Sequence, residues 1–180
     1  MTEKSTTDSI DVIYSADEIA VRVRALAREI ADRQLERLLV IAILKGSFVF
    51  AADLIRALHG AGVSPEVDFM TLSSYRKGTV SSGAVQILRD IETDVRGRNV
   101  LLVDDVLESG RTLAFAKDLL SARQAGSVST CVLLRKAVHR AVSIDADFLA
   151  FDCPDAFVVG YGMDAAYRFR ELPFVGRLVR

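Results

Sequence analysis

A short stretch of the sequence, from Val100 to Thr112, combines acidic residues with residue types that bind phosphate. Four apolar residues precede Asp104-Asp105, and Glu108 stands directly before Ser109-Gly110-Arg111-Thr112. A turn of this composition that opens a helix presents backbone N–H groups, hydroxyls and a helix N-terminus to one point, which suits a phosphate monoester. The preceding carboxylates suit ribose hydroxyls or Mg²⁺. One loop could therefore hold both ends of a 5-phosphoribosyl group.

The same residues admit a plainer interpretation, in which the two aspartates end a strand and Ser109 or Thr112 caps a helix. Three acids in five positions favour the functional interpretation. The P-loop pattern G-x-x-x-x-G-K-[ST] is absent from the sequence. Residues 160–165 match a relaxed dinucleotide-binding pattern, but the fifteen residues that follow are too few for a βαβ unit. A response-regulator receiver also opens on an acid pair, but more chain should follow than the 75 residues after Asp105.

The hydrophobic pattern predicts the elements that must position this stretch. Ser15 followed by Glu18 forms a capping-box pattern, and the apolar spacing behind it predicts a helix that ends near Gln34. The continuous apolar run Leu38–Leu44 predicts a central parallel strand that is buried on both faces. Further helices are expected over 48–59 and 112–124. Further strands are expected over 67–75, 84–90, 100–103, 130–134, 148–151 and 156–159.

Strands that alternate with helices in this way predict an α/β fold with a largely parallel sheet. The polar, glycine-containing stretch 76–83 is expected to form a hairpin-like excursion or a mobile loop. Residues 1–14 are expected to pack late or fray, and the last twenty residues to be irregular.

Length and composition narrow the class of protein. The chain has 180 residues, and this length predicts a single domain over 1–180. The share of hydrophobic residues, 51%, and of charged residues, 26%, excludes a disordered tail protein. The net charge of −1 argues against sequence-blind binding of nucleic acid or of an anionic membrane. Cys131 and Cys153 are not spaced as metal ligands, and no apolar run approaches the roughly 20 residues of a membrane span. The N-terminus lacks the apolar segment of a signal peptide.

Two parts of the chain resemble a known enzyme family. Val100–Leu113 resembles the loop that binds phosphoribosyl pyrophosphate (PRPP) in the type I phosphoribosyltransferases. Residues 157–164 and 167–176 are similar to the closing segment of the hypoxanthine-guanine phosphoribosyltransferases. The resemblance spans about 38–178, with the motifs in order. It implies the type I phosphoribosyltransferase fold, in which a mostly parallel central sheet is flanked by helices and the terminal segments form a small hood.

The reaction implied by the resemblance belongs to purine salvage. It moves the 5-phosphoribosyl group of PRPP to N9 of a 6-oxopurine, hypoxanthine or guanine, and yields IMP or GMP and pyrophosphate. Pyrophosphate leaves as C1′ develops oxocarbenium character, so the site must stabilise the leaving charge, accept a purine proton and exclude water. The resemblance further implies Mg²⁺ as cofactor, a homodimer or homotetramer in the cytoplasm, and no nucleic-acid or membrane partner.

The resemblance also assigns roles on the PRPP side of the reaction. The residues that would cradle the 5′-phosphate are Ser109, Gly110, Arg111 and Thr112. The ribose hydroxyls would be bound by Asp104 and Asp105. The residues that would meet pyrophosphate, at a bend that in this family includes a non-proline cis peptide, are Lys45, Gly46, Arg140 and Arg170. A Mg²⁺ on the pyrophosphate would be held by Asp164.

On the purine side, Lys136 would bond the purine O6 and exclude adenine, whose exocyclic amine is a donor at that position. Phe157 would stack on the ring, and the Val158 backbone would read the group at C2. Ser74 and Tyr75 match the start of the family's mobile lid and would shield the reacting centre from water.

Glu108 takes the place of the presumed general base, which is Asp in much of the family. The extra methylene moves the carboxylate by roughly 1.5 Å when extended, and a misplacement of about 1 Å can lower a rate 100-fold. Either the loop compensates and Glu108 accepts the N7 proton, or Glu108 acts mainly electrostatically. We name Glu108 and Lys136 as the candidate catalytic residues.

Two other functions fit the same fold. One is a nucleotide-sensing regulator that binds RNA, of the pyrimidine attenuation type, which has a very similar Asp-Asp-Val-Leu loop. The other is a transferase that prefers xanthine. The net charge and the purine-type ending of the chain favour the salvage enzyme over the RNA-binding regulator, and the sequence does not rank hypoxanthine, guanine and xanthine.

Overall fold

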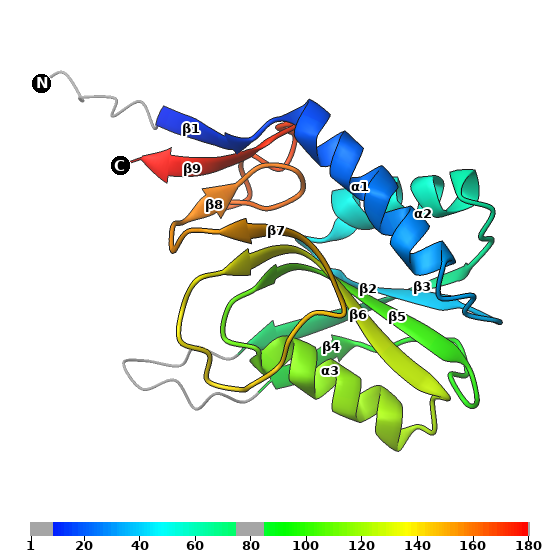
Figure 1. Cartoon of the computed structure of the whole chain (residues 1–180). Helices are drawn as coiled ribbons and strands as arrows, with labels where there is room; N and C mark the ends of the chain where they lie inside the picture. The colour runs from blue at the N-terminus through cyan, green and yellow to red at the C-terminus, as the bar shows by residue number, and fades with distance from the viewer. Residues whose placement is uncertain (1–8, 75–84, 180) are drawn as a thin grey trace, which may run out of the picture.

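The computed structural model describes residues 9–74 and 85–179, which form one large and one small sheet with three helices (Figure 1). The large sheet has the strand order β4-β3-β2-β5-β6-β7. Its strands are β2 (Leu39–Leu44), β3 (Glu66–Ser74), β4 (Val85–Arg89), β5 (Asn99–Leu107), β6 (Ser127–Lys136) and β7 (Phe148–Cys153). All neighbouring pairs are parallel except β3 with β4. The predicted α/β fold with a mostly parallel sheet is confirmed.

Helices cover both faces of this sheet (Figure 1). α1 (Ala16–Ala31) and α2 (Phe48–Gly60) lie on one face, and α3 (Arg111–Ala122) lies on the other. The side chains of β2 alternate between two cores: Val40 and Ala42 pack with α1 and α2, and Ile41 packs with α3. This two-sided burial explains why the strand is apolar throughout. None of the helices in the described residues is long and apolar enough to cross a membrane.

The two ends of the described chain form the small sheet, which we call the hood. It consists of β1 (Ser9–Tyr14), β9 (Val175–Val179) and β8 (Val158–Val159), in the order β1-β9-β8. The expectations that residues up to 14 fray and that the last twenty are irregular are therefore wrong for these strands. Ser9 pairs with Val179 at the far end of the chain, and a partner so distant leaves no local signal in the sequence. The hood built from terminal segments agrees with the resemblance.

β5 is longer than the sequence predicts, because it continues past Val103 to Leu107. Its pairing with β2 ends where Ala42 meets Val103, but its pairing with β6 continues to Leu107 and Arg135. The two aspartates after Val103 therefore lie within the strand, at its end, and not in a loop beyond it. Beyond Val103, β5 is therefore paired with β6 alone.

α1 begins with the capping box that the sequence predicts. The Glu18 N–H donates to Ser15 Oγ at 3.3 Å, and the Ser15 N–H donates to Glu18 Oε2 at 2.8 Å. The Ser15 hydroxyl also donates to Glu18 Oε2 at 2.6 Å, and this bond together with the one from the Ser15 N–H holds the pKa of Glu18 below its usual value. The helix ends at Ala31, three residues before the expected end near Gln34.

We expect Ser15→Ala to lower the free energy of unfolding by about 1 kcal/mol, because one helix N–H loses its acceptor and the capping box is broken. Urea denaturation followed by circular dichroism measures this change. The control is Ser64→Ala in the exposed loop after α2, which should change the midpoint little. Equal midpoints for the two variants would show that the cap contributes nothing to stability.

Candidate active site

A cavity of about 620 Å³ opens at the carboxyl ends of the parallel strands. Ligands in open α/β sheets bind at this edge. The predicted site residues that line it are Lys45, Gly46, Asp105, Glu108, Lys136, Phe157, Val158, Asp164 and Arg170. A smaller hollow of about 200 Å³ shares Val106 and Glu108 with it. The predicted residues that line the hollow are Asp104, Glu108, Ser109, Gly110 and Thr112. We call the two together the cleft.

The fold does not bring every predicted residue to the cleft. Arg140 donates to Ile144 O at 2.7 Å and pairs with Asp145 at 2.6 Å, so its guanidinium holds the loop after β6. Arg111 is the first residue of α3 and is absent from the described lining of the hollow. Ser74 ends β3, while Tyr75 and the stretch 76–83 lie outside the described residues.

The loop that closes the small hollow depends on Gly110. Gly110 has φ +78° and stands directly before α3, where the Ala114 N–H donates to its carbonyl at 2.9 Å. A Cβ at this position would lie 2.6 Å from Val142 O. Only glycine fits this conformation and this space, so the N-terminus of α3 can face the hollow. The helix N-terminus gives the hollow a preference for an anion.

The two aspartates at the end of β5 are held close together. Asp104 is 7% exposed, and its Oδ1 accepts the Asp105 N–H at 3.0 Å. Burial raises the pKa of Asp104 well above its usual value, and the Asp105 charge adds to this shift. Burial also raises the pKa of Asp105, while the nearby Arg170 opposes that shift. Hydrogen bonds donated to a carboxylate stabilise its charged form, so a ligand with hydroxyl donors suits this pair.

The loop between β2 and α2 lies directly against Asp105. A Cβ on Gly46 would lie 1.7 Å from Asp105 Oδ2, so no larger residue fits without a shift of the loop. Ser47 Oγ donates to Ile43 O at 2.6 Å and closes the turn. The Leu44–Lys45 peptide is cis, as the resemblance implies.

Lys136 and Glu108 form an ion pair, with Nζ and Oε2 2.9 Å apart. The pair forms because the ends of β5 and β6 are adjacent, with Leu107 opposite Arg135. The Lys136 side chain is only 10% exposed, whereas that of Glu108 is 52% exposed. A hydrogen-bond donor and a proton acceptor thus stand side by side at the junction of the cavity and the hollow.

Asp164 and Arg170 form a second pair in the cavity, with Oδ1 and Nη2 2.7 Å apart. The other Asp164 oxygen accepts the Tyr167 N–H at 2.8 Å, and Arg170 Nη1 donates to Gly162 O at 2.6 Å. The described residues contain no group of three or more His, Cys, Asp or Glu side chains that could hold a metal. Mg²⁺ commonly binds through one or two carboxylates and the substrate's phosphates, so Asp164 suits a metal that arrives with a phosphate ligand.

Sequence reasoning missed several residues that line the cavity. They are mainly apolar: Thr71, Leu72, Leu88, Val106 and Met163. Val106 could have been found, because it lies between Asp105 and Glu108 in the motif. Leu72 and Leu88 come from the antiparallel pair β3 and β4, and nothing in their own segments indicates that this pair faces the cleft.

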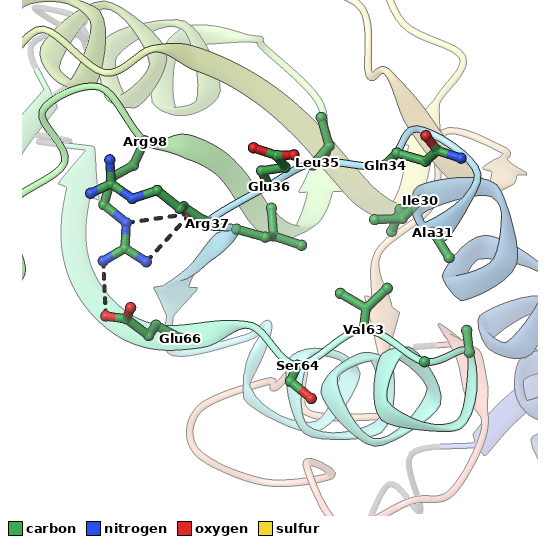
Figure 2. A pocket seen from close by; sticks show the side chains of 13 residues that line it. Ile30, Ala31, Gln34, Leu35, Glu36, Arg37, Val63, Ser64, Glu66 and Arg98 are labelled. Carbon is green, nitrogen blue, oxygen red and sulfur yellow. Dashed lines mark hydrogen bonds and ion pairs between the residues drawn. The ribbon is translucent and has the colours of Figure 1, made fainter.

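A second cavity, of about 510 Å³, lies at the other end of the strands, beside the start of β2, β3 and β5 (Figure 2). Its most buried cation, Arg98, donates to Glu66 at 2.8 Å and to the Arg37 carbonyl at 3.4 Å (Figure 2). None of the predicted site residues lines it. The ion pair between Arg98 and Glu66 holds the segment before β5 against the start of β3.

Known proteins with similar sequences match this chain over most of its length. A sequence model of the phosphoribosyl transferase domain matches residues 9–166. The hypoxanthine phosphoribosyltransferase of Escherichia coli K12 is 41% identical over 95% of this chain and 96% of its own length. The hypoxanthine-guanine phosphoribosyltransferase of Dictyostelium discoideum is 40% identical over 94% of this chain and 96% of its own.

Solved structures give the same answer for the fold. The hypoxanthine phosphoribosyltransferase of Staphylococcus aureus superposes with a TM-score of 0.87 at 35% identity, over 94% of this chain and 91% of its own. The enzyme of Trypanosoma cruzi superposes with a TM-score of 0.90 at 35% identity, over 98% of this chain and 94% of its own. The chain therefore belongs to the phosphoribosyltransferase family, in the group of the hypoxanthine phosphoribosyltransferases.

Proposed function

We propose that this protein transfers the 5-phosphoribosyl group of PRPP to hypoxanthine or guanine and releases IMP or GMP and pyrophosphate. The observation that carries the proposal is the arrangement of the cleft. The Glu108–Lys136 pair stands between a phosphate-type hollow at α3 and a cavity lined by Asp164 and Arg170. The relatives named above carry the same activity in their names.

PRPP spans the cleft in this proposal. The N-terminus of α3, with Ser109, Gly110 and Thr112, binds the 5′-phosphate, and Arg111 stays a prediction for this role. Asp104 and Asp105 accept hydrogen bonds from the ribose hydroxyls. The residues that bind the pyrophosphate group are Lys45, Gly46 and Arg170. Arg140 does not join them, because Ile144 and Asp145 hold its guanidinium.

The purine binds beside the Glu108–Lys136 pair. Lys136 donates to O6 of a 6-oxopurine, and it rejects adenine because an exocyclic amine there would face another donor. Glu108 lies next to it and takes the proton that the base loses as the new bond forms. The exposed Phe157 ring, which lines the cavity, stacks on the base, and the Val158 backbone reads the group at C2. A lid role for Ser74 and Tyr75 stays a prediction.

Mg²⁺ is the cofactor in this proposal, held through Asp164 together with the oxygens of the pyrophosphate group. When bound, the ion neutralises charge that develops on the leaving group. Arg170, which pairs with Asp164 at 2.7 Å, orients that carboxylate toward the cavity.

The proposed enzyme is a single domain in the cytoplasm and forms a homodimer or homotetramer. Val67 and Phe69 support self-association, because both are exposed on the same face of β3, where they are 36% and 41% exposed. Adjacent exposed apolar side chains on a sheet often mark a protein interface.

The proposal is tested first by the Mg²⁺-dependent release of pyrophosphate from PRPP. Hypoxanthine, guanine, xanthine, adenine and uracil are supplied in parallel. We expect turnover with hypoxanthine and guanine, none with adenine, and none after the metal is removed by a chelator. Turnover with uracil alone, or none with any base despite PRPP binding, would contradict the proposal.

We expect Glu108→Gln to lower kcat about 10²- to 10⁴-fold while the KM for PRPP stays near the wild-type value, because the amide cannot accept the proton. Steady-state kinetics with saturating hypoxanthine measures this. The matched control is Glu29→Gln, which breaks a similarly exposed ion pair with Arg22 on α1 and should leave kcat unchanged. A wild-type kcat for Glu108→Gln would end its assignment as the base.

We expect Lys136→Ala to raise the KM for hypoxanthine about 10- to 100-fold, since a charged donor to the base is lost. The control is Arg135→Ala, which removes the neighbouring side chain on β6 and its ion pair with Asp152. Its KM for hypoxanthine should stay within about twofold of wild type. If the two variants give the same KM, Lys136 does not contact the purine.

A further inference from the structure

The turn at Gly160–Met163 carries three successive residues in the left-handed region. Their φ angles are +92° at Gly160, +48° at Tyr161 and +99° at Gly162. Two glycines tolerate this conformation, but an aromatic residue adopts it only where its surroundings hold it there. The turn is closed by hydrogen bonds between Gly160 and Met163 in both directions, at 3.0 and 3.1 Å. Tyr161 is therefore the residue whose conformation requires a further explanation.

The Tyr161 side chain is anchored in the core between the hood and α2. The residue is 5% exposed, and its hydroxyl donates to Asp53 Oδ2 on α2 at 2.6 Å. Asp53 also pairs with Arg56 one turn further along the helix. Burial and the hydrogen bond to Asp53 raise the pKa of Tyr161, so the hydroxyl keeps its proton and stays a donor at neutral pH. This bond links segments that are 108 residues apart.

The turn touches the residues that the proposed function assigns to pyrophosphate. The Gly162 carbonyl accepts from Arg170 Nη1 at 2.6 Å, and the Gly162 N–H donates to the Arg170 carbonyl at 3.1 Å. Asp164 follows two residues later and pairs with Arg170. A Cβ on Gly162 would lie 2.5 Å from the Gly46 carbonyl, so the turn also rests on the loop that carries Lys45.

α2 joins both halves of this arrangement. It begins at Phe48, directly after the loop that carries Lys45 and Gly46, and Asp53 lies in its second turn. The hydrogen bond of the Tyr161 hydroxyl therefore connects the turn that precedes Asp164 to α2. The loop that carries Lys45 and Gly46 leads directly into the same helix. The distance across the cavity, where pyrophosphate would sit, therefore depends on this bond together with the contact between Gly162 and Gly46.

We infer that Tyr161 is a positioning residue, whose hydroxyl bond to Asp53 sets the place of Asp164 and Arg170 relative to Lys45 and Gly46. The bond thereby controls the affinity for the pyrophosphate group of PRPP and leaves purine binding alone. Tyr161 does not touch substrate; it acts through the turn. The inference rests on the proposed function for the identity of the ligand.

The test is Tyr161→Phe, which keeps the ring and the core packing and removes only the hydroxyl. We expect the KM for PRPP to rise about tenfold, the loss of one hydrogen bond to a charged acceptor, with the KM for hypoxanthine within about twofold of wild type. Calorimetry with Mg²⁺ and inorganic pyrophosphate should show the same weakening without turnover. The Asp53 side chain is 35% exposed, so water solvates it once the hydroxyl is gone and the variant folds.

Variants at Asp53 test the same bond from its other end. Asp53→Ala should weaken pyrophosphate binding as Tyr161→Phe does, and the double variant should be no weaker than either single variant. Asp53→Asn keeps a side-chain oxygen that accepts from Tyr161 and should restore most of the affinity. The matched control is Tyr14→Phe, whose hydroxyl donates to the Asp152 carbonyl away from the cavity and should leave both KM values unchanged.

Two results would overturn the inference. One is an unchanged KM for PRPP and unchanged pyrophosphate binding in Tyr161→Phe or Asp53→Ala. The other is an equal rise in the KM values for PRPP and hypoxanthine together with a lower melting temperature, which would indicate a general loss of structure. A wild-type enzyme that turns over none of the bases would instead contradict the proposed function, so the two failures are distinguishable.

Discussion

The close contacts at Gly46 constrain the whole cleft. On one side, the Gly46 backbone lies against the Asp105 carboxylate at the end of β5, and on the other its carbonyl lies against Gly162 in the turn after β8. Three segments that are distant in the chain therefore meet at a residue that has no side chain. Close packing of this kind transmits a shift in any one segment to the other two, because protein interiors have little free space to absorb it. The loop, the strand and the turn after β8 must therefore move together or stay fixed together.

Two ion pairs stand in the cleft before any ligand binds. Lys136 faces Glu108, and Arg170 faces Asp164, within a protein whose net charge is only −1. A bare polyanion entering the cleft meets carboxylates as well as cations, and it gains less than it would from an open basic patch. A divalent cation that arrives with the anion offsets this repulsion. Under the proposed function, this pairing favours a metal-bound diphosphate over other anions.

The sequence predicts the elements that carry strong local signals. Leu38–Leu44 is apolar throughout because both of its faces are buried, which predicts a central strand. Ser15 and Glu18 form the capping box that begins α1, so the start of this helix is also predictable from the sequence. The phosphate-type loop at Gly110 can be predicted from the sequence because its turn, glycine and helix start are contiguous.

Features that depend on a distant partner cannot be predicted from the local sequence. The sequence of β1 alone does not predict a strand, because the strand forms by pairing with β9, where Ser9 lies opposite Val179. The Tyr161–Asp53 bond likewise joins residues that are 108 positions apart. Arg140 fell outside the cleft because the path of its loop, and not its spacing from Lys136, decides where it points.

The pairing of β1 with β9 has a consequence for synthesis of the protein. β1 leaves the ribosome first among the described strands, but its partner β9 is the last to emerge. The large sheet can assemble while translation continues, since its strands and helices precede β8 and β9 and domains commonly begin to fold during synthesis. The hood cannot close until β9 has been synthesised, and Asp164 and Arg170 are carried on the segment that leads into β9. The nascent chain therefore holds the phosphate-type loop before it can form the complete cleft.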